Sequence, residues 1–154
     1  MKKGFPETRG NRLALTAEQE QAFRTEQDKV ITERVGIILL LGCVFVPMFG
    51  LADYLLYPAY FSEFVTYRLI AAACCLALYA VNRRFTLGAS SFYLGMAAAY
   101  IVSFDIIGMI VKTGGYSTPY YAGLSLVFLG MGAVLPARTG SLILHSAILY
   151  GCYL

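Results

Sequence analysis

Three ionisable side chains stand inside or at the ends of long apolar runs of this sequence. Asp53 and Arg68 lie on either side of the turn that follows the first run, and Asp105 lies within a later run. A charged side chain at the centre of a bilayer costs about 2.5–3.5 kcal/mol, so such residues usually pair with one another or mark a functional site. We expect the three side chains to meet in one half of a helical bundle, with Arg68 between or beside the two carboxylates.

Such a cluster has two interpretations. It is either an ion pair between helices that only stabilises the fold, or the polar floor of an outward-facing pocket for a small ligand with hydroxyl or carbonyl groups. Hydroxyl groups on a later run are available as partners in both cases. The candidate ligand-binding residues are Asp53, Arg68, Asp105, Tyr120, Tyr121 and Ser125.

Other reactive residues do not form a recognisable catalytic or metal-binding pattern. His145, the only histidine, lacks companions, so we expect it to pack and form a hydrogen bond, with haem ligation or a proton relay as alternatives. The four cysteines lie in apolar runs without disulfide or zinc spacing: Cys43, Cys74, Cys75 and Cys152. The sequence therefore predicts no catalytic residue, no metal and no other cofactor within this chain, and it leaves open whether the full-length protein is an enzyme.

Composition shows which elements must position the polar cluster. Of the 154 residues, 58% are hydrophobic and 14% are charged, against about 25% charged in an ordinary soluble domain. Seven of the 12 basic and six of the 9 acidic residues lie within the first 34 positions. We therefore expect a polar segment, residues 1–34, joined to a membrane domain, residues 35–154. The small net charge of +3 indicates membrane orientation and not nucleic-acid binding.

Five apolar runs, separated by turns rich in Pro, Gly, Asn and Arg, make up the membrane domain. They cover residues 35–56, 67–81, 91–111, 120–135 and 141–154. Each run is continuously apolar and does not alternate, so the pattern predicts an all-α, polytopic transmembrane helical bundle. Pro47 should kink the first helix near its middle and is a candidate hinge.

The polar segment predicts a short cytoplasmic helix. Thr16 and Gln19 match a capping box at its start, and Glu20 is correctly spaced to pair with Arg24. The apolar positions Phe23, Val30 and Ile31 share one side, which would suit the bilayer surface or a second copy of the chain.

Basic residues orient the bundle. If the tail is cytoplasmic, its seven basic residues share that side with Arg83, Arg84 and Arg138, while only Arg68 and Lys112 fall on the other side. The last run is too short to cross about 30 Å of hydrocarbon. We therefore expect the natural protein to continue beyond Leu154, through the rest of this span and a sixth helix.

The pattern resembles a known class of membrane domain. Asp53-Tyr54 and Tyr57-Pro58 end the first run, Tyr67-Arg68-Leu69 opens the second, and Gly114-Gly115-Tyr116 precedes Pro119-Tyr120-Tyr121. This order is similar to the six-helix N-terminal sensor domains of bacterial histidine kinases, and to related modules before some class III adenylate cyclases. The resemblance implies a homodimeric receptor in the bacterial cytoplasmic membrane that detects a small apolar or amphipathic signal.

The leading hypothesis is thus the input domain of a two-component sensor histidine kinase, with the lipid bilayer, a small-molecule signal and a second copy as partners. The input domain of a nucleotide or diguanylate cyclase is an alternative. Only the sequence downstream of Leu154 would distinguish it from the input domain of a kinase. A small transporter is less consistent with the sequence, because a transport path would require polar residues throughout the membrane.

Overall fold

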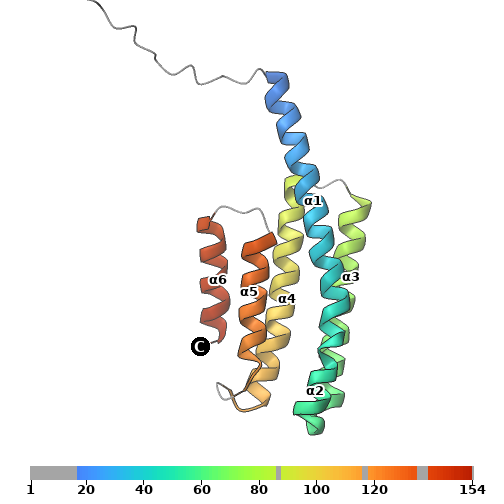
Figure 1. Ribbon diagram of the computed structural model, residues 1–154, viewed down its shortest axis with the longest axis vertical. Helices are drawn as coiled ribbons and strands as arrows, with labels where there is room; N and C mark the ends of the chain where they lie inside the picture. The colour runs from blue at the N-terminus through green and yellow to red at the C-terminus, as the bar shows by residue number, and fades with distance from the viewer. Residues whose placement is uncertain (1–16, 86–87, 116–117, 135–138, 154) are drawn as a thin grey trace, which may run out of the picture.

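The computed structural model describes residues 17–85, 88–115, 118–134 and 139–153, and within these ranges it is all helical, with no strand. The α-helices are α1 (Ala17–Met48), α2 (Gly50–Leu56), α3 (Phe61–Arg84), α4 (Ser91–Lys112), α5 (Tyr121–Val134) and α6 (Thr139–Tyr153). Two short 3₁₀ turns, η1 (Pro58–Tyr60) and η2 (Gly88–Ser90), precede α3 and α4. The long helices lie side by side as a bundle (Figure 1).

The helix α4 is the centre of this bundle. It packs against α1, α3 and α5, and α6 lies at the edge against α4 and α5 (Figure 1). One core cluster, around Leu39, Cys75 and Met96, joins α1, α3 and α4. A second cluster, around Phe64, Ile106 and Leu124, joins α3, α4 and α5 near the opposite end. Because α4 is shared, it fixes the positions of α1 and α5 relative to each other.

The first helix is longer than a single apolar run. No glycine or proline interrupts residues 17–35, and α1 continues unbroken from Ala17 to Met48. Its first part, residues 18–27, is exposed on all sides and stands clear of the bundle (Figure 1). Arg24 donates to Glu20 at 2.8 Å, at the spacing that the sequence predicts. Thr16 of the expected capping box lies outside the described residues.

A break near Pro47 separates α1 from α2. Pro47 lies in the last turn of α1, Phe49 forms the break, and α2 begins at Gly50. Because proline has no backbone N–H, the carbonyl four residues earlier loses its helical partner. The expected kink is therefore a break between two helices, and it places Asp53 on a short separate segment.

Three helical segments are long and apolar enough to cross a membrane: Glu18–Leu56, Pro58–Arg84 and Gly88–Lys112. The apolar helices Tyr121–Ala133 and Ile143–Cys152 are shorter. Of the five spans that the sequence predicts, the first three thus reach spanning length within the described residues. The second begins earlier than expected, since α3 starts at Phe61.

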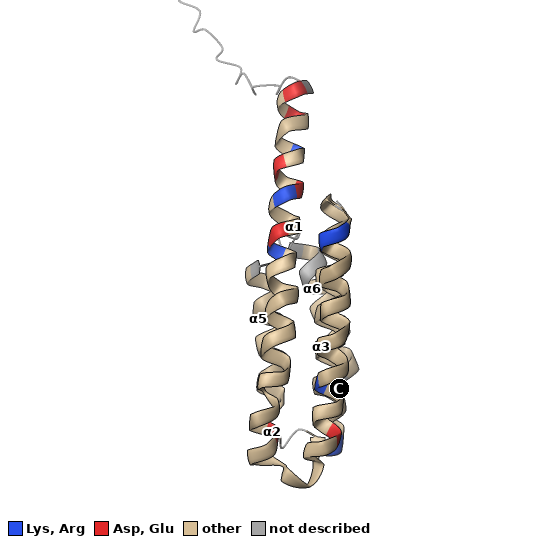
Figure 2. Cartoon of the chain, turned by 90° about the vertical axis from the view of Figure 1, so that its right-hand side faces the viewer, with Lys and Arg blue, Asp and Glu red and all other residues tan. Residues whose placement is uncertain are grey.

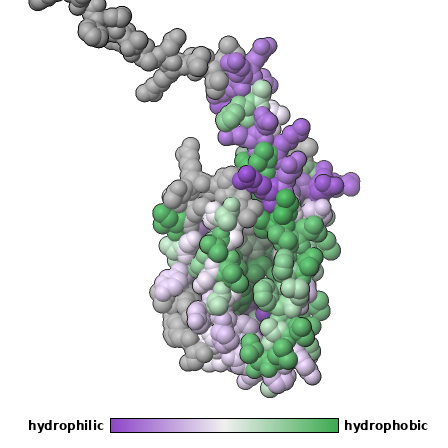
Figure 3. All heavy atoms as spheres, viewed as in Figure 1, coloured by the Kyte–Doolittle hydropathy of each residue, from purple (hydrophilic) through white to green (hydrophobic). Residues whose placement is uncertain are grey.

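The outer surface of the bundle is apolar. Leu55, Val111 and Leu129 are each at least 70% exposed. Many other large hydrophobic side chains are also exposed, to a lesser extent. Charged residues gather toward the two ends of the long helices, with a long uncharged stretch between them (Figure 2). Hydrophilic side chains cover the upper part of α1, and hydrophobic ones spread over the bundle below (Figure 3). A contiguous apolar surface of this kind suits lipid and not water.

Polar contacts fix the turn between α3 and α4 against α1. The Asn82 side chain donates to the Thr32 carbonyl at 3.0 Å, and the Thr32 and Ser91 hydroxyls lie 3.2 Å apart. Gly88 has a φ of 51°, and a Cβ built there would lie 2.7 Å from an Asp28 carboxylate oxygen. The turn therefore needs glycine both for its backbone conformation and for its close approach to α1.

Replacing Gly88 by Ala should lower the free energy of unfolding by at least about 1 kcal/mol, because a left-handed conformation costs non-glycine residues about 1–2 kcal/mol. Gly108→Ala is the control, since no described atom outside its own helix would lie within 4 Å of the added Cβ. Thermal unfolding in detergent measures both changes. Equal midpoints for the two variants would contradict this description of the turn.

Candidate functional site

A buried ion pair joins α2 to α3. It lies toward the end of the bundle opposite the exposed residues 18–27 of α1. The side chain of Asp53 is fully buried, and Arg68 is 6% exposed. Arg68 donates from Nε to Oδ2 of Asp53 and from Nη2 to Oδ1, the latter at 2.9 Å. This two-bond geometry is the strongest arrangement of guanidinium and carboxylate.

Tyr120 extends the pair toward α5. Its hydroxyl donates to Oδ1 of Asp53 at 2.8 Å. The Tyr120 ring stacks on Tyr57 with centroids 5.5 Å apart and meets Phe64 edge-on at 5.9 Å. The Asp53 carboxylate therefore binds side chains from α3 and from the residue that precedes α5.

Asp105 on α4 is the second carboxyl group beside Arg68. Its Oδ2 lies 3.7 Å from Nη1 of Arg68, and its side chain is 4% exposed. Neither oxygen of Asp105 accepts a hydrogen bond from any residue that the structure describes. The cluster thus holds one guanidinium and two carboxyl groups, of which only Asp53 is satisfied by hydrogen bonds.

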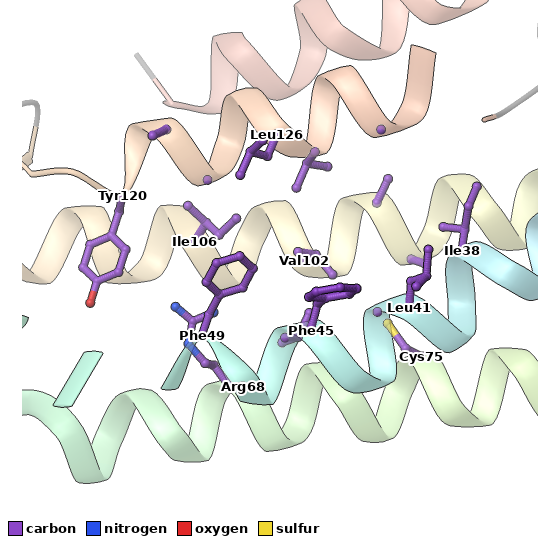
Figure 4. A pocket seen from close by; sticks show the side chains of 18 of the residues that line it. Ile38, Leu41, Phe45, Phe49, Arg68, Cys75, Val102, Ile106, Tyr120 and Leu126 are labelled. Carbon is purple, nitrogen blue, oxygen red and sulfur yellow. The ribbon is translucent and has the colours of Figure 1, made fainter. Parts of the chain in front are cut away.

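A groove of about 550 Å³ extends from this cluster along the bundle. Its two walls are α1 and α5, and α4 forms its floor through Val102 and Ile106 (Figure 4). Arg68 and Tyr120 lie toward one end of the groove and Ile38 toward the other (Figure 4). The guanidinium of Arg68 also lies 5.8 Å from the centre of the Phe49 ring, a cation–π contact at the polar end.

The groove opens on the apolar flank of the bundle. Phe45 on α1 and Phe49 at the break after α1 are 44% and 45% exposed, and Leu126 on α5 is 57% exposed. All three line the groove and present apolar edges at its mouth. A molecule bound in the groove would therefore remain partly exposed at the side of the bundle.

The structure brings together four of the six candidate ligand-binding residues. Asp53, Arg68 and Tyr120 line the groove, and Asp105 lies beside the Arg68 guanidinium without lining the groove itself. Tyr121 and Ser125 lie elsewhere: both are exposed, and the Ser125 hydroxyl donates to the Tyr121 carbonyl at 3.3 Å. Residues four apart share one face of a helix, so the side chains of Tyr121 and Ser125 lie together on a face of α5 that does not line the groove.

Sequence reasoning did not identify the apolar walls. Two pairs of residues four apart line the groove: Phe45 on α1 with Phe49 just after it, and Leu126 with Gly130 on α5. That spacing shows that each pair shares a face. It does not distinguish a face that lines a groove from one that packs in the core or meets lipid.

His145 forms the packed, hydrogen-bonded contact that the sequence predicts. Its Nδ1 lies 2.6 Å from the Tyr100 hydroxyl, and this contact links α6 to α4. Among the described residues, no group of three or more His, Cys, Asp or Glu side chains is arranged to hold a metal ion. The ionisable cluster at the groove is therefore the main candidate site.

No family model matches the chain, and neither does any curated protein or solved structure.

The two carboxyl groups should respond differently to the same substitution. Asp53→Asn removes the carboxylate that accepts both hydrogen bonds from Arg68, and breaking a buried ion pair typically costs about 3–5 kcal/mol. Asp105→Asn removes no hydrogen bond within the described residues and should cost less than about 1 kcal/mol. Thermal unfolding in detergent compares the two. Equal destabilisation would show that Asp105, and not Asp53 alone, holds the bundle together.

Proposed function

We propose that this chain is a membrane-embedded sensing domain that binds a small apolar or amphipathic molecule in the groove between α1 and α5. The observation that carries the proposal is an apolar groove with a buried ionisable cluster at one end. Ligand sites commonly occupy about 300–1,000 Å³ and combine apolar walls with a few polar groups that fix orientation. The groove has this composition.

The helix α1 supplies a route from the groove to the other end of the bundle. Ile38, Phe45 and Phe49 line the groove at or near α1, and the same helix continues to Ala17 without a break. A ligand that displaces the α1 wall would therefore move the exposed residues 18–27. In this proposal Pro47, beside the break, is the hinge about which that movement occurs.

Topology and output follow from the sequence pattern. We infer five spans with the N-terminus in the cytoplasm of a bacterial cell, because ten basic residues then fall on the cytoplasmic side and two on the other. In this orientation the exposed part of α1 lies in the cytoplasm. The resemblance to histidine kinase sensor domains favours a homodimer with a kinase output domain. In the alternative, the input domain of a cyclase, the groove and α1 would have the same roles and only the output domain would differ.

Gly130 offers a direct test of the groove. It lines the groove, and no described atom outside its own helix lies within 4 Å of a Cβ built there, so a larger side chain would fill the groove without a clash at that Cβ. Gly132→Leu is the matched control, since its Cβ also meets open space and it does not line the groove. Both changes replace glycine by a better helix former.

The full chain in lipid nanodiscs is photolabelled with a linear alkyl diazirine that carries only a terminal alkyne. Labelled peptides should come from the groove walls of α1 and α5. Gly130→Leu should abolish most of this labelling because the side chain occupies the same space, whereas Gly132→Leu should leave it intact. Labelling that is spread evenly over the apolar surface, or that Gly130→Leu does not change, would contradict the proposed sensing function.

A further inference from the structure

The polar groups at one end of the groove are already bound to one another. Asp53 is fully buried and accepts hydrogen bonds from Arg68 and Tyr120, which are themselves 6% and 8% exposed. The Phe49 ring lies 5.8 Å from the Arg68 guanidinium, and Asp105 does not line the groove. A molecule in the groove therefore contacts apolar side chains along almost its whole length. Such surroundings fit a hydrocarbon chain and not a polar head group.

The groove is about as long as one leaflet of a bilayer is deep. Its wall on α5 runs from Ala122 to Met131, nine residues further, which is about 14 Å at 1.5 Å per residue. The hydrocarbon core of a bilayer is about 30 Å thick, so one leaflet contributes about 15 Å. On the opposite wall, Phe49, Phe45 and Ile38 follow one another along α4 (Figure 4). One extended chain parallel to the helices would therefore fill the groove.

The open side of the groove continues into the apolar outer surface of the bundle. Phe45 and Leu126 line opposite walls of the groove, and both are exposed. Next to them, Val44 on α1 and Leu129 on α5 are exposed without lining the groove. This outer surface suits lipid and not water. A hydrocarbon chain can therefore enter the groove sideways from a bilayer without crossing water.

The two ends of the groove determine the direction of the chain. At one end the groove reaches Leu56, the last residue of α2, and Pro119, in the turn before α5. At the other end, Met131 belongs to the core cluster that also contains Leu39 and Met96, and all three are buried. A chain whose head group stays at the membrane surface must therefore have that head group at the α2 end and its terminal methyl group toward Met131.

We propose that the groove binds one acyl chain of a bilayer phospholipid, with the head group outside the groove at the α2 end of the bundle. This inference rests on the proposed sensing function and names its ligand as a component of the surrounding membrane. The acyl chain lies between Phe45 on α1 and Leu126 on α5, over Val102 and Ile106 of α4. It thus acts on the same α1 wall through which the sensing function requires a signal to pass.

Phospholipids with a diazirine in one acyl chain test the position and direction of that chain. The protein is reconstituted in phosphatidylcholine nanodiscs with a trace of a phosphatidylcholine whose diazirine lies either near the ester or near the terminal methyl group. After illumination, mass spectrometry locates the label. The probe near the ester should label the groove around Phe49, and the probe near the methyl group should label it around Ile38 and Met131. The reverse order, or labels spread evenly over the exposed faces of all the helices, would overturn the proposal.

Gly130→Leu and Gly132→Leu separate the groove from the lipid around the bundle, since only Gly130 lines the groove. With the probe near the methyl group, Gly130→Leu should lower the labelling of Ile38 at least about tenfold, which corresponds to about 1.4 kcal/mol of affinity. Gly132→Leu should leave that labelling unchanged. Both variants should keep the labelling of Leu76, an exposed side chain of α3 outside the groove, which verifies that they are folded and inserted. Equal labelling of Ile38 in Gly130→Leu and in the unaltered protein would overturn the proposal.

Native mass spectrometry identifies the source of the acyl chain. Protein purified in mild detergent from a bacterial expression host should retain one phospholipid per protein chain. Gly130→Leu should lose this lipid, whereas Gly132→Leu should keep it. A free fatty acid or another single-chain molecule in place of the phospholipid, or no retained lipid, would contradict the proposed source.

The possible failures can be told apart. If the free alkyl diazirine labels the groove and Gly130→Leu blocks it, but neither phospholipid probe labels the groove walls, the inference about the ligand fails and the sensing function stands. If neither the free nor the lipid-borne diazirine labels the groove of the unaltered protein, the sensing function fails as well.

Discussion

The arrangement of this bundle depends on one buried carboxylate. Asp53 accepts two hydrogen bonds from Arg68 and one from Tyr120, so segments before and after α4 in the sequence meet at a single side chain. In apolar surroundings each of these polar groups would be costly if unpaired. The pairing therefore determines where α2, α3 and the start of α5 must lie. Asp53 thereby accepts three hydrogen bonds, whereas the buried oxygens of Asp105 accept none from the described residues.

The groove follows from this constraint and from small side chains. Asp53 and Tyr120 hold α2 and the start of α5 together at one end, while α4 packs against both α1 and α5. Gly123 meets Ile106 closely, since a Cβ there would lie 3.4 Å away, whereas a Cβ on Gly130 would meet open space. Close packing near the cluster thus gives way to an open groove farther along. The same helix that forms one wall leaves the bundle as an exposed segment.

The sequence predicted the helical class and the meeting of Asp53, Arg68 and Asp105, because ionisable residues in apolar runs have few alternatives to one another. It did not separate Tyr120 from Tyr121, since that choice depends on where α5 begins, one residue after Tyr120. The groove could not be foreseen either, because Phe45 and Leu126 have the same composition and spacing as core or lipid-facing residues. Pro47 indicated a kink, but only the structure shows that α1 ends at Met48 and that Asp53 lies on a separate helix, α2.

A double-mutant cycle on Asp53 and Arg68 tests the central claim most directly. Unfolding free energies are measured in detergent for Asp53→Asn, Arg68→Gln and the double variant, and a parallel cycle pairs Arg68→Gln with Asp105→Asn. The bidentate geometry requires a coupling energy of at least about 2 kcal/mol for Asp53 and Arg68. The 3.7 Å ion pair between Arg68 and Asp105 has no hydrogen bond, so its coupling energy should be smaller than that of Asp53 and Arg68. Additive effects of Asp53 and Arg68, or a stronger coupling through Asp105, would contradict the structure described for the site.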